Sequence, residues 1–308
     1  NGLALCLNQD CCGEVIDYYG GLRDLQQGEI RFLHNLSFID DPTRILRAVR
    51  FAERYKFKLA KITSEAIATA LEAEVFSKVS PERFTEELML IYGEGNYQAM
   101  GGKLVETGVL KSWFQAELPW NFSERQNTAA WPLEKRWLAS IKNFSDQEAD
   151  GLFVRLRLNK SLYRITQEYL QTKDKLRRYL QEQKAVEAGD HERNRNTSEG
   201  NSDNHRNGCR EMVWNPVALD EILVGVSEVI REVLAFDHEF ATVVKRYIIT
   251  VSAINMKTTG SELIQAGIKE GPEIGSILRD IRNLWLQGKI QTQAEETVYL
   301  ENLLDAKQ

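Results

Sequence analysis

The sequence predicts a mainly α-helical protein whose first part also contains short strands. Helix start signals, a small polar residue followed by proline, stand at residues 41–42 and 80–81. From residue 64 onward, apolar residues recur with helical spacing. The alternation that is typical of strands is confined to residues 1–7 and 15–17, so we expect little sheet.

The composition is that of an ordinary globular protein. The chain has 308 residues, 43% of them apolar and 27% charged, and this length corresponds to about two domains. We expect no membrane segment, because no apolar run approaches the roughly 20 residues that span a bilayer and no signal peptide begins the sequence. The net charge of −6 argues against nucleic-acid binding over the whole surface, so any RNA would bind a local basic patch.

The cysteines and histidines do not indicate a metal site. The four cysteines contain no Cys-x-x-Cys pair, and the four histidines are scattered along the chain. Such cysteine usage is typical of a protein of the reducing cytosol without structural zinc, so we predict a cytoplasmic protein. The cysteines are Cys6, Cys11, Cys12 and Cys209.

The beginning of the chain is typical of a β-hairpin followed by a glycine turn. Residues 1–7 and 15–17 alternate as two strands would, with residues 8–13 as the turn between them. The paired glycines Gly20 and Gly21 permit backbone conformations that other residues avoid, although a simple turn explains them equally well.

The most informative segment is the helix predicted to start at Asp41. Its carboxylate is a good N-cap, and Pro42 falls at the first helical position, where a missing N–H costs nothing. Asp41, Arg44 and Arg47 share one arc of this helix at spacings of three, and apolar residues occupy another. One face can therefore pack while the other presents a carboxylate and two guanidinium groups. The apolar residues are Ile45, Leu46, Val49 and Ala52.

This polar face could distinguish nucleobases. Cytosine and adenine both present an exocyclic amino donor beside a ring-nitrogen acceptor, so a carboxylate can accept from the first while an arginine donates to the second. Uracil and guanine present a carbonyl beside a ring N–H, and the same pair would leave buried polar groups unpaired. The simpler interpretation is a capping aspartate beside a solvated basic face.

Residues 40–51, with the pattern Asp-Asp-x-x-Arg-x-x-Arg-Ala-x-Arg-Phe, resemble the nucleotide-selecting motif of the bacterial-type tRNA nucleotidyltransferases (CCA-adding enzymes) and related poly(A) polymerases. The family usually has Glu-Asp at the first two positions, so Asp40 is a conservative departure. The resemblance implies that Asp41 and Arg44 read the incoming base of ATP or CTP and that Arg47 helps to hold the nucleotide. The resemblance also implies that Asp40 is one of the nucleotide-binding residues.

Two further segments resemble the same family. Residues 17–25, Asp-x-x-Gly-Gly-x-x-Asp-Leu, resemble the link between the family's catalytic α/β head and its neck. Residues 81–88, Pro-Glu-Arg-x-x-x-Glu-Leu, resemble a neck helix that lies against the nucleotide-reading helix. The resemblance implies that Glu82 and Arg83 support that helix. Without it they would be a surface ion pair, worth under about 1 kcal/mol.

The catalytic carboxylates of the family are missing from this sequence. In-line nucleotidyl transfer uses carboxylates that hold divalent ions, which the family supplies as Asp-x-Asp on a strand of the head. This chain contains no Asp-x-Asp, and residues 40–41 are adjacent and lie at a helix start. We therefore expect an N-terminally truncated enzyme that is inactive by itself, with no catalytic or metal-binding residue and with the Mg²⁺ ligands in the missing head.

Basic residues in the second half form another candidate site. Lys175, Arg177 and Arg178 give local positive charge on a helix, and Lys269 lies in a tight helix–turn–helix at residues 260–278. That helix–turn–helix resembles the end of many family members. The basic residues would contact the phosphates of tRNA, although a solvated helical face is the simpler explanation.

These observations predict five parts. They are a remnant of an α/β nucleotidyltransferase head (1–38), a neck with the nucleotide-selecting and RNA-binding helices (39–97), a helical body (98–184), a disordered linker or insertion (185–212) and a helical tail (213–308). The linker is expected because that stretch has almost no apolar residues.

The predicted function is the transfer of C and/or A from CTP or ATP to the 3′ end of tRNA. Two alternatives stay open. One is a non-catalytic helical RNA-binding protein derived from the family, and the other is a poly(A) polymerase. The sequence does not distinguish addition of C, of A or of both.

Overall fold

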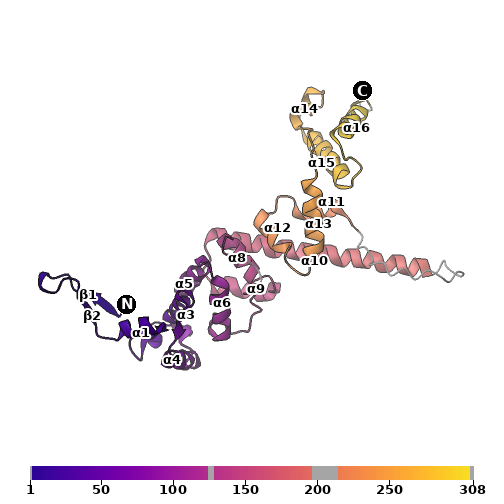
Figure 1. Ribbon diagram of the computed structural model, residues 1–308. Helices are drawn as coiled ribbons and strands as arrows, with labels where there is room; N and C mark the ends of the chain where they lie inside the picture. The colour runs from indigo at the N-terminus through magenta and orange to yellow at the C-terminus, as the bar shows by residue number, and fades with distance from the viewer. Residues whose placement is uncertain (1, 124–127, 196–213, 306–308) are drawn as a thin grey trace. The chain divides into compact units, whose positions relative to one another are not determined.

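The computed structural model describes residues 2–123, 128–195 and 214–305. These residues are mostly helical, which confirms the predicted fold class, and the chain divides into two compact units, Asn1–Thr166 and Gln167–Gln308 (Figure 1). Within the described part, no helix is both long and apolar enough to cross a membrane.

The hairpin predicted at the beginning of the chain is present. β1 (Leu3–Leu5) pairs antiparallel with β2 (Val15–Asp17), and a short 3-10 helix, η1 (Gln9–Cys11), lies in the turn. One expectation needs correction here, because Cys6 and Cys11 form a disulfide and are not two free thiols. The turn brings their Cα atoms to 5.7 Å, a separation that suits a disulfide.

Asp17 and the glycines after it start the first helix. The Asp17 carboxylate accepts hydrogen bonds from the N–H groups of Gly21 and Leu22, at 2.8 and 3.0 Å, and so caps α1 (Gly21–Gln27). Gly20 has φ +76°, a left-handed conformation that favours glycine. The Asp-x-x-Gly-Gly segment therefore encodes a helix start.

Four helices and a short parallel strand pair follow in unit 1. They are β3 (Glu29–Ile30) paired with β4 (Lys58–Leu59), α2 (Ser37–Asp40), α3 (Thr43–Tyr55), α4 (Lys61–Glu72) and α5 (Pro81–Gly93), with the 3-10 helix η2 (Val75–Lys78) before α5. α3 is in contact with α5, and the predicted apolar arc of α3 is buried, with Ile45, Leu46 and Val49 fully enclosed.

Both predicted helix starts are found. α3 is assigned from Thr43, and Pro42 before it already has helical backbone angles, φ −62° and ψ −22°. Asp41 Oδ1 accepts the backbone N–H of Thr43 at 3.2 Å and its hydroxyl at 2.6 Å. The aspartate still satisfies a first-turn N–H group. α5 begins at Pro81 as predicted, and the Ser80 hydroxyl accepts the N–H of Arg83 at 3.4 Å.

The remaining helices of unit 1 enclose an aromatic core. They are α6 (Tyr97–Glu106), α7 (Val109–Phe114), α8 (Leu133–Ser140) and α9 (Asp146–Arg155). Phe84 of α5 stacks on Trp113 of α7, with ring centroids 4.0 Å apart. Trp137 of α8 is fully buried, and its indole N–H donates to the Thr166 hydroxyl at 2.8 Å. α5 is thereby anchored in the core of the unit as well as against α3.

α10 (Lys160–Arg195) begins in unit 1 and continues into unit 2. Unit 2 also contains α11 (Pro216–Leu223), α12 (Glu228–Leu234), α13 (Ala241–Ser252), α14 (Gly260–Gln265), α15 (Pro272–Leu286) and α16 (Gln293–Asp305). Residues 185–195, which were predicted to begin a disordered linker, are instead the last part of helix α10. Extending an existing helix is easier than nucleating one, so polar residues can follow in helical form. Residues 196–213 lie outside the described part, where the linker stays a prediction.

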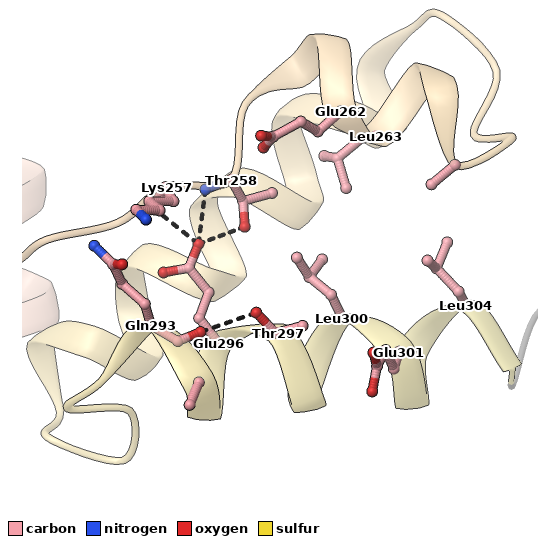
Figure 2. A pocket seen from close by; sticks show the side chains of 12 residues that line it. Lys257, Thr258, Glu262, Leu263, Gln293, Glu296, Thr297, Leu300, Glu301 and Leu304 are labelled. Carbon is pink, nitrogen blue, oxygen red and sulfur yellow. Dashed lines mark hydrogen bonds between the residues drawn. The ribbon is translucent and has the colours of Figure 1, made fainter.

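A buried carboxylate holds the last three helices together. Glu296 of α16 accepts the backbone N–H groups of Lys257 and Thr258, at 3.2 and 2.7 Å, before α14 begins (Figure 2). Its other oxygen accepts the indole N–H of Trp285 in α15 at 2.8 Å. Pro272 is the first residue of α15. Between α14 and α16 the side chains leave a hollow of about 520 Å³.

A second carboxylate joins α11 to α13 and α15. Asp220 accepts two hydrogen bonds from Arg282, from Nε and Nη2 at 2.7 Å each, and one from the Tyr247 hydroxyl at 2.8 Å. Burial alone would raise the pKa of Asp220, but the hydrogen bonds from Arg282 and Tyr247 outweigh it and lower the pKa. The pKa of Glu296 is lowered in the same way, with burial opposed by hydrogen bonds from Thr258 and Trp285.

We expect acid to destabilise the protein through these two carboxylates. Their pKa values are lower in the folded state, so their contribution to the free energy of unfolding is complete at neutral pH and is lost as the pH falls through the carboxylate range. The urea midpoint, followed by circular dichroism, should fall steadily between about pH 6 and about pH 3. The double variant Asp220→Asn/Glu296→Gln should show a weaker dependence. The same acid dependence in parent and variant would contradict this assignment.

Candidate functional site

The candidate site lies in unit 1, where α3 and α5 are in contact (Figure 1). Asp41, in the turn between α2 and α3, accepts a hydrogen bond from Arg83 Nη2 of α5 to its Oδ1 at 2.9 Å. Its Oδ2 lies 3.7 Å from Arg44 Nε, one helical turn along α3. The structure therefore brings together three residues that the sequence singled out.

The two oxygens of Asp41 have different surroundings. Oδ1 accepts the N–H and hydroxyl of Thr43 and the guanidinium of Arg83. Oδ2 faces only Arg44 Nε among the described residues. Burial would raise the pKa of this carboxyl, but the Thr43 hydroxyl and the charge of Arg83 outweigh it and lower the pKa. Asp41 is thus an ionised carboxylate with one oxygen left to accept a hydrogen bond.

The guanidinium of Arg44 is held on one side. Its Nη1 donates to the Ser37 hydroxyl at 3.0 Å and to the Nε2 atom of the His34 imidazole at 3.3 Å. The side chain stays 41% exposed, and its Nη2 makes no hydrogen bond to any residue that the structure describes. Asp41 Oδ2 and Arg44 Nη2 together offer one acceptor and one donor.

A hollow adjoins Arg44, although Asp41 is not among the residues that line it. It measures about 390 Å³, and both Arg44 and Arg47 line it, together with His34, Ser37 and Phe51. A second hollow of about 820 Å³ shares part of its wall and is lined by aromatic side chains. Those side chains are Tyr19, Phe32, Phe51, Tyr55 and Phe57. Arg44 therefore faces an open space, as a nucleotide-reading side chain must.

Arg47 belongs to a ladder of ion pairs between α3 and α5. Its Nε lies 3.9 Å from Glu87, and Arg50 lies 3.6 Å from the same carboxylate. Arg50 and Arg54 also flank Glu94, at 3.8 and 3.4 Å. Burial raises the pKa of Glu87, although the charges of Arg50 and Arg47 oppose it. Sequence reasoning assigned no role to either glutamate; Glu87 lies in α5, and Glu94 directly follows its last residue.

Glu82 and Asp40 lie away from the base-facing pair. Glu82 contacts neither Asp41 nor Arg44, contrary to expectation, because its carboxylate pairs with Arg157 Nε at 3.2 Å. Neighbouring positions on a helix point about 100° apart, so Arg83 can face α3 while Glu82 does not. Asp40 ends α2 and is exposed, with its Oδ2 4.0 Å from His34 Nδ1.

The basic residues proposed for RNA contact are partly engaged by acidic neighbours. Arg177 pairs with Glu239 at 3.3 Å, and Arg178 pairs with Asp174. Lys175 and Lys269 are exposed. The interpretation of Arg177 and Arg178 as a solvated helical face, stabilised by ion pairs, thus gains a physical basis.

The side chains at the site do not suit a divalent metal ion. Within residues 2–123, 128–195 and 214–305, no group of three or more His, Cys, Asp or Glu side chains could hold one. Asp41, the carboxylate at the centre of the site, lies between the guanidinium groups of Arg83 and Arg44, whose positive charge opposes a cation. The site suits an uncharged base edge or an anionic phosphate instead.

Comparison of sequences identifies relatives that act on tRNA. The chain is 45% identical over 94 residues to an A-adding tRNA nucleotidyltransferase of Geobacter sulfurreducens, a match that covers 30% of this chain and 11% of that protein. It is 38% identical over 135 residues to the A-adding tRNA nucleotidyltransferase of Halalkalibacterium halodurans, covering 42% of this chain and 30% of the relative. The matched segment is thus less than a third of either relative. No family model matches the chain.

Comparison of structures extends the likeness to nearly the whole chain. The CCA-adding enzyme of Thermotoga maritima, solved in complex with tRNA, superposes with a TM-score of 0.67 at 23% identity, over 99% of this chain and 71% of that one. A CCA-adding enzyme solved with ATP gives a TM-score of 0.65 at 24% identity, over 100% and 70% of the two chains. Another, solved with CTP, gives 0.66 at 24% identity, over 98% and 69%. At these identities the likeness shows a shared fold.

Proposed function

Since this chain is a relative of the bacterial tRNA nucleotidyltransferases, we propose that it takes part in adding C and/or A from CTP or ATP to the 3′ end of tRNA. Its own residues select and hold the nucleotide. The first sequence relatives are named as A-adding enzymes, which supports ATP as one substrate. The solved neighbours that contain ATP, CTP and tRNA support the same set of ligands. Such an enzyme would act in the cytoplasm, where tRNA is matured.

The observation that carries this proposal is the pair of free atoms at the site. Asp41 Oδ2 can accept from the exocyclic amino group of adenine or cytosine, while Arg44 Nη2 donates to the neighbouring ring nitrogen. Guanine and uracil place a carbonyl against the carboxylate and an N–H against the guanidinium. Such a mismatch leaves desolvated polar groups unpaired, which is how a protein rejects a close analogue. Arg47, exposed beside the hollow that Arg44 also lines, would hold the phosphates.

This proposal assigns nucleotide selection to residues 39–97 and tRNA contact to the neck and to the helices that follow. The sequence contains no Asp-x-Asp pair, and the charges around Asp41 do not suit Mg²⁺, so we derive no metal-dependent step from this chain. The transfer step itself requires carboxylates that hold the metal ions. Carboxylates of this kind would complete the chemistry on the nucleotide that Asp41 and Arg44 have selected.

Replacing Arg44 by alanine tests the base-reading role. We expect the Kd for ATP and CTP to rise by about 10- to 100-fold, the effect of losing a charge-assisted hydrogen bond. The Kd for GTP and UTP should change little, and the melting temperature should stay the same because the side chain is outside the core. Calorimetric titration of each triphosphate into the purified chain gives all four values.

Arg54→Ala is the matched control, because Arg54 lies on the same helix, is similarly exposed and pairs with Glu94 away from Asp41. It should leave the preference for ATP and CTP intact. Binding of all four triphosphates with equal affinity by the parent chain would refute the proposed function. Unchanged selectivity in Arg44→Ala would refute the role of that residue.

A further inference from the structure

The exposed imidazole of His34 lies beside the proposed base-reading arginine. Its Nε2 is 3.3 Å from Arg44 Nη1, and its Nδ1 is 4.0 Å from the Asp40 carboxylate. The buried hydroxyl of Ser37 accepts from the same Arg44 nitrogen at 3.0 Å. Asp40, His34 and Arg44 therefore form a chain of contacts that ends at the guanidinium group.

We propose that His34 is a positioning residue that, together with Ser37, orients Arg44 for base selection. This inference rests on the proposed function of Arg44. Among the described residues, His34 and Ser37 hold Nη1, and Asp41 Oδ2 lies 3.7 Å from Nε, too far for a hydrogen bond. Holding Nη1 limits the orientations in which Nη2 can meet a ligand. The donor that meets the base is thereby fixed before the nucleotide binds.

The guanidinium group of Arg44 needs to be held in place because its side chain is partly exposed to solvent. The side chain is 41% exposed at the surface of α3, where a free arginine would populate many rotamers. Ordering those rotamers on binding would weaken the affinity for every nucleotide and blur the choice between them. A residue that holds the guanidinium in advance reduces this loss.

The same geometry gives Asp40 a role. One nitrogen of a neutral imidazole carries a proton and the other accepts, and the neighbours of the ring decide which. The negative charge of Asp40 beside Nδ1 favours the proton there and leaves the Nε2 lone pair to accept from Arg44. Asp40 would therefore act on the nucleotide through His34 and not by direct contact.

A double-mutant cycle on ATP binding distinguishes positioning from a general structural effect. We expect His34→Leu to raise the Kd for ATP by about tenfold and to reduce the preference for ATP over GTP. In the Arg44→Ala background the same substitution should have no further effect, because the residue through which it acts is gone. An equal effect of His34→Leu in both backgrounds would overturn the proposal.

Two amide variants at the same position sharpen the test. Glutamine can place its side-chain oxygen where Nε2 lies, so His34→Gln should keep most of the affinity. Asparagine is too short to reach Arg44, so His34→Asn should behave as His34→Leu. Equal Kd values for the glutamine and leucine variants would overturn the proposal. Asn35→Ala, a change at the exposed neighbour, serves as the control and should bind ATP as the parent does.

An NMR measurement on the protein without bound nucleotide tests the positioning role of His34 independently of the proposed function. The Nε–H signal of Arg44 in ¹⁵N NMR spectra, assigned by its loss in Arg44→Lys, reports how rigid the guanidinium group is. Its heteronuclear NOE should fall in His34→Leu/Ser37→Ala and stay at the parent value in Asn35→Ala. If the parent does not prefer ATP to GTP, the proposed function fails, and this measurement alone decides whether His34 and Ser37 together position Arg44. An unchanged NOE in the double variant would overturn that role.

Discussion

Gly101→Ala is expected to lower the free energy of unfolding by about 3 kcal/mol, the upper end of the range of about 1 to 3 kcal/mol that overpacking of a filled site typically costs. Gly101 is buried in α6, and a Cβ atom added there would lie 2.6 Å from Cζ of Phe122 and closer still to two other carbons of the ring. The ring stacks on Trp120 with centroids 5.9 Å apart, so turning it aside would cost this contact. Urea unfolding followed by circular dichroism measures the change.

Gly102 provides the matched control in the same helix. A Cβ atom added there would meet nothing within 4 Å. Alanine is favoured over glycine in a helix by about 1 kcal/mol, so Gly102→Ala should raise the urea midpoint slightly. The change from glycine to alanine should thus lower the urea midpoint at position 101 and raise it at position 102. A midpoint for Gly101→Ala equal to that of the parent would show that the Phe122 ring moves freely.

Most of the helices could be predicted because their signals are local. Ser80 and Pro81 start α5 where the sequence indicates, and the apolar arc of α3 is buried residue by residue. The assigned start of α3 lies one residue after Pro42, and the predicted capping by Asp41 is present. The Cys6–Cys11 disulfide was missed because only the hairpin turn brings the two residues together.

The candidate site was predictable in part. The spacing of Asp41 and Arg44 on one helix follows from periodicity alone, and the family resemblance added Arg83. His34 and Ser37 were missed because their contacts to Arg44 depend on how the turn before α3 folds back. Glu82 was misassigned because residue spacing does not reveal which side of α5 faces α3. Contacts between side chains of different elements need the packed structure.

A buried arginine fixes the other end of the helix that carries Arg83. Arg136 of α8 is buried and donates to four backbone carbonyl groups. Its Nη1 reaches the carbonyls of Tyr92 and Glu94 at the end of α5, both at 2.7 Å. Positive charge at a helix C-terminus is favourable, and here it also satisfies carbonyl groups that have no partner within the helix. Glu94, held in this way, pairs with Arg50 and Arg54 of α3.

Arg136→Met should therefore lower the free energy of unfolding by about 4 kcal/mol, because it keeps the length of the side chain but leaves buried carbonyl groups without donors. Arg164→Met, at an exposed position of α10, is the control. It should change the free energy of unfolding by less than about 0.5 kcal/mol. Urea unfolding of both variants at neutral pH compares them directly. Equal midpoints for the parent and Arg136→Met would contradict the role of the buried guanidinium.

Arg136→Lys separates the contribution of charge from that of geometry. Lysine keeps the positive charge near the end of α5 but has a single nitrogen, whereas the four carbonyls are reached from three nitrogens of the arginine. We expect lysine to recover less than half of the lost stability. A nearly complete recovery would mean that the charge at the helix end dominates. The end of α5 would then be fixed by electrostatic attraction, without the directional bonds that set the position of Glu94 and, through it, of α3.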